Sequence, residues 1–133
     1  MQIRTLTMPT PSIQLSIVIP LYNEEATLLP LFEKILSTVE THALGSFEVI
    51  FVDDGSTDSS WEQLTSLKQQ HPENVSALRF RRNQGKAAAL SAGFAAVKGE
   101  TVVTMDADLQ DEPTEIPKLI EKLNEGYDCV SGW

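Results

Sequence analysis

Short apolar runs rich in β-branched residues alternate with longer segments of helical periodicity along most of this chain. Such alternation is typical of βαβ units, in which parallel strands form one sheet and the connecting helices cover its faces. We therefore expect an α/β fold with a mainly parallel sheet and helices on both faces. Strands are expected at residues 15–20, 47–52, 75–80, 101–105 and 127–130, and helices at about residues 24–43, 59–70, 86–97 and 114–124.

The expected strand at residues 101–105 ends in an acidic segment. Asp106 and Asp108 follow it directly, and Gln110 comes two positions later. In an extended backbone alternate side chains share a face, so these three side chains would point the same way. Three oxygen-bearing groups on one edge suit a hard divalent cation such as Mg²⁺. The plainer alternative for this segment alone is an acidic loop that caps the helix opened by Pro113.

A second expected strand, residues 47–52, also ends in aspartates, Asp53 and Asp54, with Gly55 behind them. In open parallel sheets, ligands bind in the crevice beyond the carboxyl ends of the strands. Both pairs of aspartates would therefore reach the same rim of the sheet. A turn needs one aspartate as a cap, whereas two strand ends with paired aspartates favour a metal-dependent ligand site.

The composition of the chain limits the kinds of molecule and metal that it is expected to bind. The chain has 133 residues, enough for one domain, and carries 10 basic against 19 acidic residues, a net charge of −9. This balance argues against general nucleic-acid binding, which relies on basic surfaces. A single cysteine excludes an internal disulfide and a cysteine-rich zinc site.

The ends of the chain differ from its middle. Residues 1–14 show no periodicity and are expected to form a flexible leader before a domain at residues 15–133. No signal peptide or apolar stretch of membrane-spanning length is found, so we expect a cytoplasmic location. The chain stops directly after the last expected strand, which suggests a truncated domain.

Several segments resemble the motifs of family 2 glycosyltransferases, which have the GT-A fold. In the family's order they are residues 16–24 (SIVIPLYNE), 52–58 (VDDGSTD), 82–86 (RNQGK) and 105–110 (MDADLQ). The last two are most similar to the polyprenyl-phosphate branch, which includes dolichyl- and undecaprenyl-phosphate glycosyltransferases. The resemblance implies a Rossmann-like domain that binds a nucleotide-diphospho-sugar, with UDP or GDP as the nucleotide.

The resemblance also implies roles for individual residues at the nucleotide. Pro20, Tyr22 and Glu24 would border it, with the Tyr22 ring near the base. Asp54 would accept a hydrogen bond from the base, and Asp53 would support that turn.

Further roles implied by the resemblance concern the metal and the phosphates. Asp106, near the ribose, would hold Mg²⁺ or Mn²⁺ together with Gln110 and with Asp108, the expected catalytic residue. Arg82 and Lys86 would lie near the phosphates or the sugar. A fixed cation would stabilise the negative charge that develops on the leaving diphosphate. Lys86 would add a positive charge where a helix N-terminus already favours anions.

The expected reaction is an inverting, metal-assisted transfer of a sugar, with a polyprenyl phosphate as acceptor. Family members continue into an acceptor-binding half, so this chain would be the donor-binding part and nearly inactive alone. The full-length parent would work at the cytoplasmic face of a membrane. The sheet edge exposed by the truncation would favour self-association.

Other functions share some of these features. A family member with the same donor site can act on a polysaccharide or another hydroxyl acceptor. A sugar nucleotidyltransferase also uses aspartates and a metal, but it places a Gly-rich basic loop where residues 21–24 read LYNE. A receiver-like domain with an acidic pocket, which is not an enzyme, would not explain Tyr22, Asp54 and residues 106–110 together.

Overall fold

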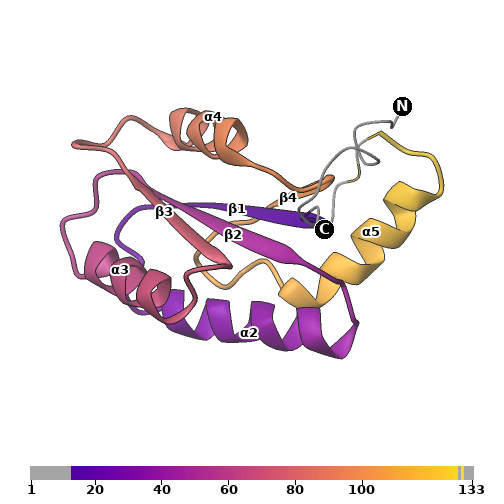
Figure 1. The fold of residues 1–133 in the computed structure, drawn as a ribbon. Helices are drawn as coiled ribbons and strands as arrows, with labels where there is room; N and C mark the ends of the chain where they lie inside the picture. Colours follow the sequence, from indigo (N-terminus) through magenta and orange to yellow (C-terminus); the bar gives the residue numbers. More distant parts are fainter. Residues whose placement is uncertain (1–12, 129, 131–133) are drawn as a thin grey trace.

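The computed structural model describes residues 13–128 and 130, and a parallel sheet of four strands forms its centre (Figure 1). The sheet order is β3-β2-β1-β4, and all neighbouring strands are parallel. The predicted α/β class with a parallel sheet is confirmed. The strands are β1 (Leu15–Leu21), β2 (Phe47–Asp53), β3 (Val75–Arg79) and β4 (Thr101–Thr104).

Helices cover both faces of the sheet, as predicted. In Figure 1, α2 and α3 lie below the sheet and α4 lies above it. A 3-10 turn, η1, contacts α2 and leads into α5. The bounds are α2 (Leu28–Thr41), α3 (Ser60–Gln70), α4 (Lys86–Ala96), η1 (Pro113–Glu115) and α5 (Ile116–Asn124).

The main core lies between the sheet and α2. Every residue of β1 is buried, because helices cover its two faces and strands flank its two edges. Alternate residues of β1 pack toward α2, whose own apolar side chains recur at helical spacing. Burying each large apolar side chain contributes about 1.5–3 kcal/mol. The buried apolar residues of α2 are Leu28, Leu31, Phe32, Ile35 and Val39.

On the other face, α4 lies very close to the sheet because a glycine faces it. A Cβ atom on Gly93 would lie 2.4 Å from Cγ1 of Val18 in β1 and 3.4 Å from Cγ2 of Val52 in β2. The first distance is shorter than real Cβ contacts, so the present spacing requires glycine. This close approach fixes the start of α4 beside the carboxyl edge of the sheet.

The opposite edge of the sheet is held by a buried carboxylate. Glu48 Oε2 accepts hydrogen bonds from the Ser16 hydroxyl at 2.6 Å and from the Lys98 N–H at 2.7 Å. The Ser16 Oγ in turn accepts one from the Gly99 N–H at 2.8 Å. These bonds tie the turn before β4 to the starts of β1 and β2.

Two predicted elements differ in the structure. The helix expected from residue 24 begins at Leu28, because Asn23 has a φ of +53° and the Glu24 N–H bonds to Ser60 Oγ across the loop. Of the strand expected at residues 127–130, residue 129 lies outside the described residues, and the prediction was wrong for residues 127, 128 and 130, which are not in a strand. Within the described residues the sheet ends at β4, and these three residues pair with none of its strands.

The expected leader lies mostly outside the described residues. Its last two residues, Ile13 and Gln14, bond to the turns beside them: the Ile13 carbonyl accepts from the Glu100 N–H at 3.2 Å. The Gln14 carbonyl accepts from the Thr101 N–H at 3.0 Å. None of the helices in the described part of the chain combines the length and the hydrophobicity that a membrane span requires.

Candidate functional site

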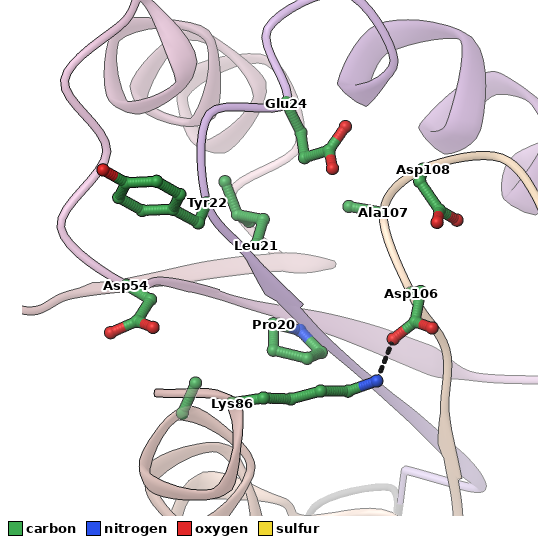
Figure 2. Close-up of a pocket in the computed structure, with 10 residues that line it drawn as sticks. Pro20, Leu21, Tyr22, Glu24, Asp54, Lys86, Asp106, Ala107 and Asp108 are labelled. Carbon is green, nitrogen blue, oxygen red and sulfur yellow. Dashed lines mark ion pairs between the residues drawn. The ribbon is translucent and has the colours of Figure 1, made fainter. Parts of the chain in front are cut away.

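A cavity of about 220 Å³ opens at the carboxyl edge of the sheet, near the ends of β1, β2 and β4 (Figure 2). Here the strand order reverses, since β2 lies on one side of β1 and β4 returns on the other. Ligands of open α/β sheets bind at such a reversal. The cavity is lined by Pro20, Leu21, Tyr22, Glu24, Asp54, Lys86, Ala89, Asp106, Ala107 and Asp108.

Most of the residues predicted for the site line this cavity, and each motif contributes to it. Figure 2 shows Tyr22 and Asp54 on one side and the two aspartates of the segment after β4 on the other. Asp53, Arg82 and Gln110 do not line it. The structure therefore brings together side chains from segments that lie far apart in the sequence.

The acidic segment after β4 is a folded loop rather than an extended edge. Leu109 has a φ of +67°, which no strand residue adopts. Asp108 Oδ1 accepts a hydrogen bond from the Gln110 N–H at 3.1 Å, and Asp111 Oδ2 accepts one from the Asp106 N–H at 2.8 Å. The prediction that an extended backbone aligns Asp106, Asp108 and Gln110 was wrong, because the strand ends before them. Both aspartates still line the cavity, and Gln110 does not.

Lys86 forms an ion pair across the cavity with Asp106. Its Nζ lies 2.6 Å from Asp106 Oδ1, and their side chains are 61% and 46% exposed. The hydrogen bond to Asp106 raises the pKa of Lys86, burial partly opposes this effect, and the charges of Asp106, Asp111 and Asp108 raise the pKa further. Lys86 is the first residue of α4, so its positive charge stands at a helix N-terminus.

Asp54 holds the loop that leads into α4. Its Oδ1 accepts a hydrogen bond from the Gln84 N–H at 2.7 Å, and its Oδ2 accepts one from the Gly85 N–H at 3.0 Å. Gly85 has a φ of +100°, which favours glycine there. Asp54 thus lines the cavity and also fixes the backbone from which Lys86 projects.

Asp53, its neighbour, is fully buried in the described structure. Its Oδ1 accepts a hydrogen bond from the Ser56 N–H at 2.8 Å, which closes the turn after β2. Its Oδ2 has no hydrogen-bond partner among the described residues. Asp53 therefore contacts the turn and not the cavity.

The loops after β1 and β2 are joined by Asn23, a residue that sequence reasoning missed. Asn23 Oδ1 accepts a hydrogen bond from the Thr57 N–H at 2.8 Å, and the Asn23 N–H donates to Ser56 Oγ at 2.8 Å. These bonds hold the backbone next to Tyr22, whose side chain is 44% exposed at the cavity. The signal in the sequence was an asparagine, which tolerates positive φ, between a strand and a helix.

The arginines around β3 lie beside the cavity rather than in it. A second hollow of about 220 Å³ is lined by Gly55, Ser56, Arg79, Phe80 and Arg81. The Arg79 guanidinium lies 5.2 Å from the centroid of the Trp61 ring. Arg82 is exposed, and its carbonyl carbon would lie 2.6 Å from a Cβ on Gly55.

The cavity fits a cation that binds together with a ligand. Within the described part of the chain, no three Asp, Glu, His or Cys side chains are arranged to hold a metal by themselves. Asp106 and Asp108, however, line the same cavity. Mg²⁺ is commonly bound through one or two carboxylates, with waters and substrate phosphates in its other positions. This donor set suits a cation that arrives with a diphosphate.

Comparison with known proteins places this geometry in context. The model of the family described as glycosyl transferase family 2 matches residues 16–133. The undecaprenyl-phosphate 4-deoxy-4-formamido-L-arabinose transferase of Salmonella paratyphi B is 41% identical over 118 residues, which cover 88% of this chain and 36% of that protein. The chain thus spans little more than a third of this curated relative.

Solved structures give the same result for the fold. The mannosyltransferase PcManGT from Pyrobaculum calidifontis, in complex with GDP-Man and Mn²⁺, has a TM-score of 0.63 and 26% identity. That match covers 79% of this chain and 32% of the other. Glucosyl-3-phosphoglycerate synthase from Mycobacterium tuberculosis has a TM-score of 0.59 and 28% identity. This match covers 86% of this chain and 40% of the synthase chain.

Proposed function

This chain belongs to glycosyltransferase family 2, and we propose that the protein that carries it transfers a sugar from a nucleotide-diphospho-sugar to a polyprenyl phosphate. The cavity at the strand reversal is the single observation that carries the proposal. There, Asp106, Asp108 and Lys86 face one space large enough for part of such a donor.

The arrangement of side chains gives the donor an orientation. Tyr22 offers an exposed aromatic face for the base on one side of the cavity. Asp106 and Asp108 lie on the other side, where the amine of Lys86 meets Asp106 and where the diphosphate would be. The bound GDP-Man of PcManGT, a relative in fold and sequence, supports a donor of this class.

Asp106 and Asp108 are the residues that would hold Mg²⁺ or Mn²⁺ with the donor. The cation would neutralise the charge that develops on the leaving diphosphate. The Mn²⁺ of PcManGT supports a divalent metal, and the chemistry of two carboxylates suits either ion. Gln110, whose backbone bonds to Asp108, is proposed to support the loop rather than to hold the metal.

Lys86 is proposed to change partner when the donor binds. Its ion pair with Asp106 is exposed to solvent, so little energy opposes its transfer to a phosphate oxygen. The raised pKa of Lys86 keeps it positively charged at neutral pH. It would therefore contribute a fixed positive charge beside the N-terminus of α4.

A phosphate acceptor simplifies the reaction. An oxygen of the acceptor phosphate attacks the anomeric carbon, the bond from that carbon to the diphosphate breaks, and the nucleoside diphosphate leaves with the electron pair. A phosphate monoester has a second pKa near about 6, so it is already largely ionised at pH 7 and needs no general base. Attack from the face opposite the leaving group inverts the anomeric centre. The name of the Salmonella relative, an undecaprenyl-phosphate transferase, supports this acceptor, and hence work at the cytoplasmic face of a membrane.

The test is to supply the full-length protein with labelled UDP- and GDP-sugars and with undecaprenyl phosphate. We expect label in a lipid-extractable product that mild acid releases. The Asp108→Asn variant is expected to lose this product, because it removes a carboxylate from the cavity. Label found only on a sugar or protein hydroxyl would overturn the acceptor, and no transfer from any nucleotide-sugar would overturn the enzyme class.

A further inference from the structure

Thr27, the residue just before α2, contacts the acidic loop that follows β4. Its hydroxyl donates a hydrogen bond to the carbonyl of Ala107 at 2.6 Å, across 80 positions of sequence. Ala107 lies between the two aspartates that line the cavity and is itself only 3% exposed. Thr27 therefore holds the backbone at the centre of the acidic loop.

The hydroxyl of Thr27 has other acceptors nearby, but only one proton to donate. Glu24 Oε2 lies 3.1 Å away and the Glu24 carbonyl lies 3.2 Å away. The contact with Ala107 is the shortest, so it is the preferred hydrogen bond. Because Glu24 also lines the cavity, Thr27 connects the two loops that border it.

Apart from the ion pair of the Asp106 side chain with Lys86, the remaining hydrogen bonds of this loop run within residues 106–111. The Asp106 N–H bonds to Asp111 and the Gln110 N–H bonds to Asp108. In the described part of the chain, the bond from Thr27 is the one hydrogen bond that ties this loop's backbone to another element. Removing it would leave the carbonyl of Ala107, which is packed in the core, without this partner and would loosen the backbone between the two aspartates.

Apolar packing places Thr27 rigidly. Leu28, the next residue, is fully buried in the core with Met105 and Ile116, which flank the acidic loop. A side chain anchored in this way can hold its hydrogen-bond partner with little loss of entropy. α2 thus serves as a fixed support for the loop.

We infer that Thr27 is a positioning residue that sets the separation and direction of Asp106 and Asp108 toward the metal and the diphosphate. The inference rests on the proposed function, because it concerns the same acidic pair. Groups that orient metal ligands typically alter metal affinity by about 10–100-fold when they are removed. Since Thr27 acts on the backbone between the ligands, we expect the lower end of this range.

The experiment measures the Kd of Mn²⁺ in the full-length protein with saturating UDP or GDP, by electron paramagnetic resonance of the free ion. Thr27→Val keeps the shape of the side chain without the hydroxyl and should raise this Kd about tenfold. Thr27→Ser keeps the hydroxyl and can make the same hydrogen bond. Its Kd should therefore stay within about twofold of the wild-type value. The matched control is Thr38→Val on α2, whose hydroxyl bonds to the Lys34 carbonyl at 2.8 Å away from the cavity.

The outcomes separate this inference from the proposed function. Loss of Mn²⁺ binding in Asp108→Asn, with weaker binding in Thr27→Val and unchanged binding in Thr38→Val, supports both. If Asp108→Asn binds Mn²⁺ as the wild type does, the proposed metal site is wrong. If Asp108→Asn loses the metal while Thr27→Val binds it normally, Thr27 is merely structural and the proposed function stands. A Thr27→Ser variant as weak as Thr27→Val would also overturn the role of the hydroxyl.

Discussion

Asp54 illustrates how one side chain can serve both fold and site. Each of its carboxylate oxygens accepts a backbone N–H in the loop before α4. Hydrogen bonds to charged groups each contribute about 1.5–3 kcal/mol. Because Asp54→Ala removes both bonds, we expect it to lower the free energy of unfolding by about 3–6 kcal/mol and to weaken nucleotide binding with or without metal.

Urea denaturation together with calorimetry measures both effects of Asp54→Ala. Asp108→Asn is the control, because an asparagine oxygen can still accept the Gln110 N–H and the residue is exposed. Its stability should stay within about 0.5 kcal/mol of the wild type. Unchanged stability in Asp54→Ala would contradict the supporting role given to this residue.

The ion pair of Lys86 with Asp106 should make the stability of the protein depend on pH in the alkaline range. The pKa of Lys86 in the folded protein is raised above its ordinary value of 10.5. At any pH below 10.5, Lys86 therefore makes its full contribution to the stability of the folded protein. The contribution disappears as the pH rises through the folded pKa. Because the pair is exposed, we expect Lys86→Met to cost less than about 1 kcal/mol, equally at pH 7 and pH 9.

The measurement is the difference in unfolding free energy between wild type and Lys86→Met from neutral to strongly alkaline pH. This difference should vanish only at the alkaline end. Lys68→Met removes an exposed lysine of α3 that has no ion pair among the described residues, and it should show no matching loss. A difference that disappears below pH 9 would contradict the ion pair with Asp106.

At the scale of elements, α4 depends on its glycine. Gly93→Ala places a methyl group 2.4 Å from Cγ1 of Val18, and overpacking of this kind costs about 1–3 kcal/mol. The better helix propensity of alanine offsets about 1 kcal/mol of that cost. We expect a net loss of stability, measured by thermal and urea denaturation.

A second substitution tests whether the contact with Val18 causes this loss of stability. Val18→Ala opens space at the contact, so the double variant with Gly93→Ala should lose less than the sum of the two single variants. Ser91→Ala, at an exposed position of the same helix, should be neutral or slightly stabilising. Additive losses at Gly93 and Val18 would show that this contact does not set the helix position.

The elements that could be predicted from the sequence are those with a strong local pattern. β1 to β4 are short apolar runs, and the apolar face of α2 recurs at helical spacing, so their types and approximate bounds followed directly. The acidic loop could not be predicted in the same way, because the positive φ of Leu109 depends on tertiary contacts. Residues 127–130 have a strand-like pattern in the sequence, but residues 127, 128 and 130 do not pair with any strand among the described residues.

The site was predictable where a residue type identifies its own chemistry. Aspartates at strand ends and a lysine at a helix start indicated a shared rim, and the cavity contains Asp54, Lys86, Asp106 and Asp108. The supporting residues were not predictable, because Asn23 and Thr27 act through backbone contacts with distant loops. Such contacts leave no local pattern in the sequence.

At the scale of the whole molecule, β4 forms an edge of the sheet within the described residues. Val102 and Thr104 are exposed on this strand. An uncovered edge strand can pair with another chain, so we expect self-association that increases with protein concentration. Light scattering should detect it, and Val102→Lys should reduce it, because a charge on an edge strand opposes pairing. A monodisperse monomer at high concentration would contradict this prediction.

The proposed function requires that the cavity at the strand reversal binds a nucleotide diphosphate with a divalent cation. Isothermal titration of UDP and of GDP into the protein, with and without Mn²⁺, tests it directly. We predict that one nucleotide binds, that Mn²⁺ strengthens its binding, and that Asp108→Asn removes most of this metal dependence. Binding that is the same with and without Mn²⁺, and the same in Asp108→Asn as in the wild type, would contradict the claim.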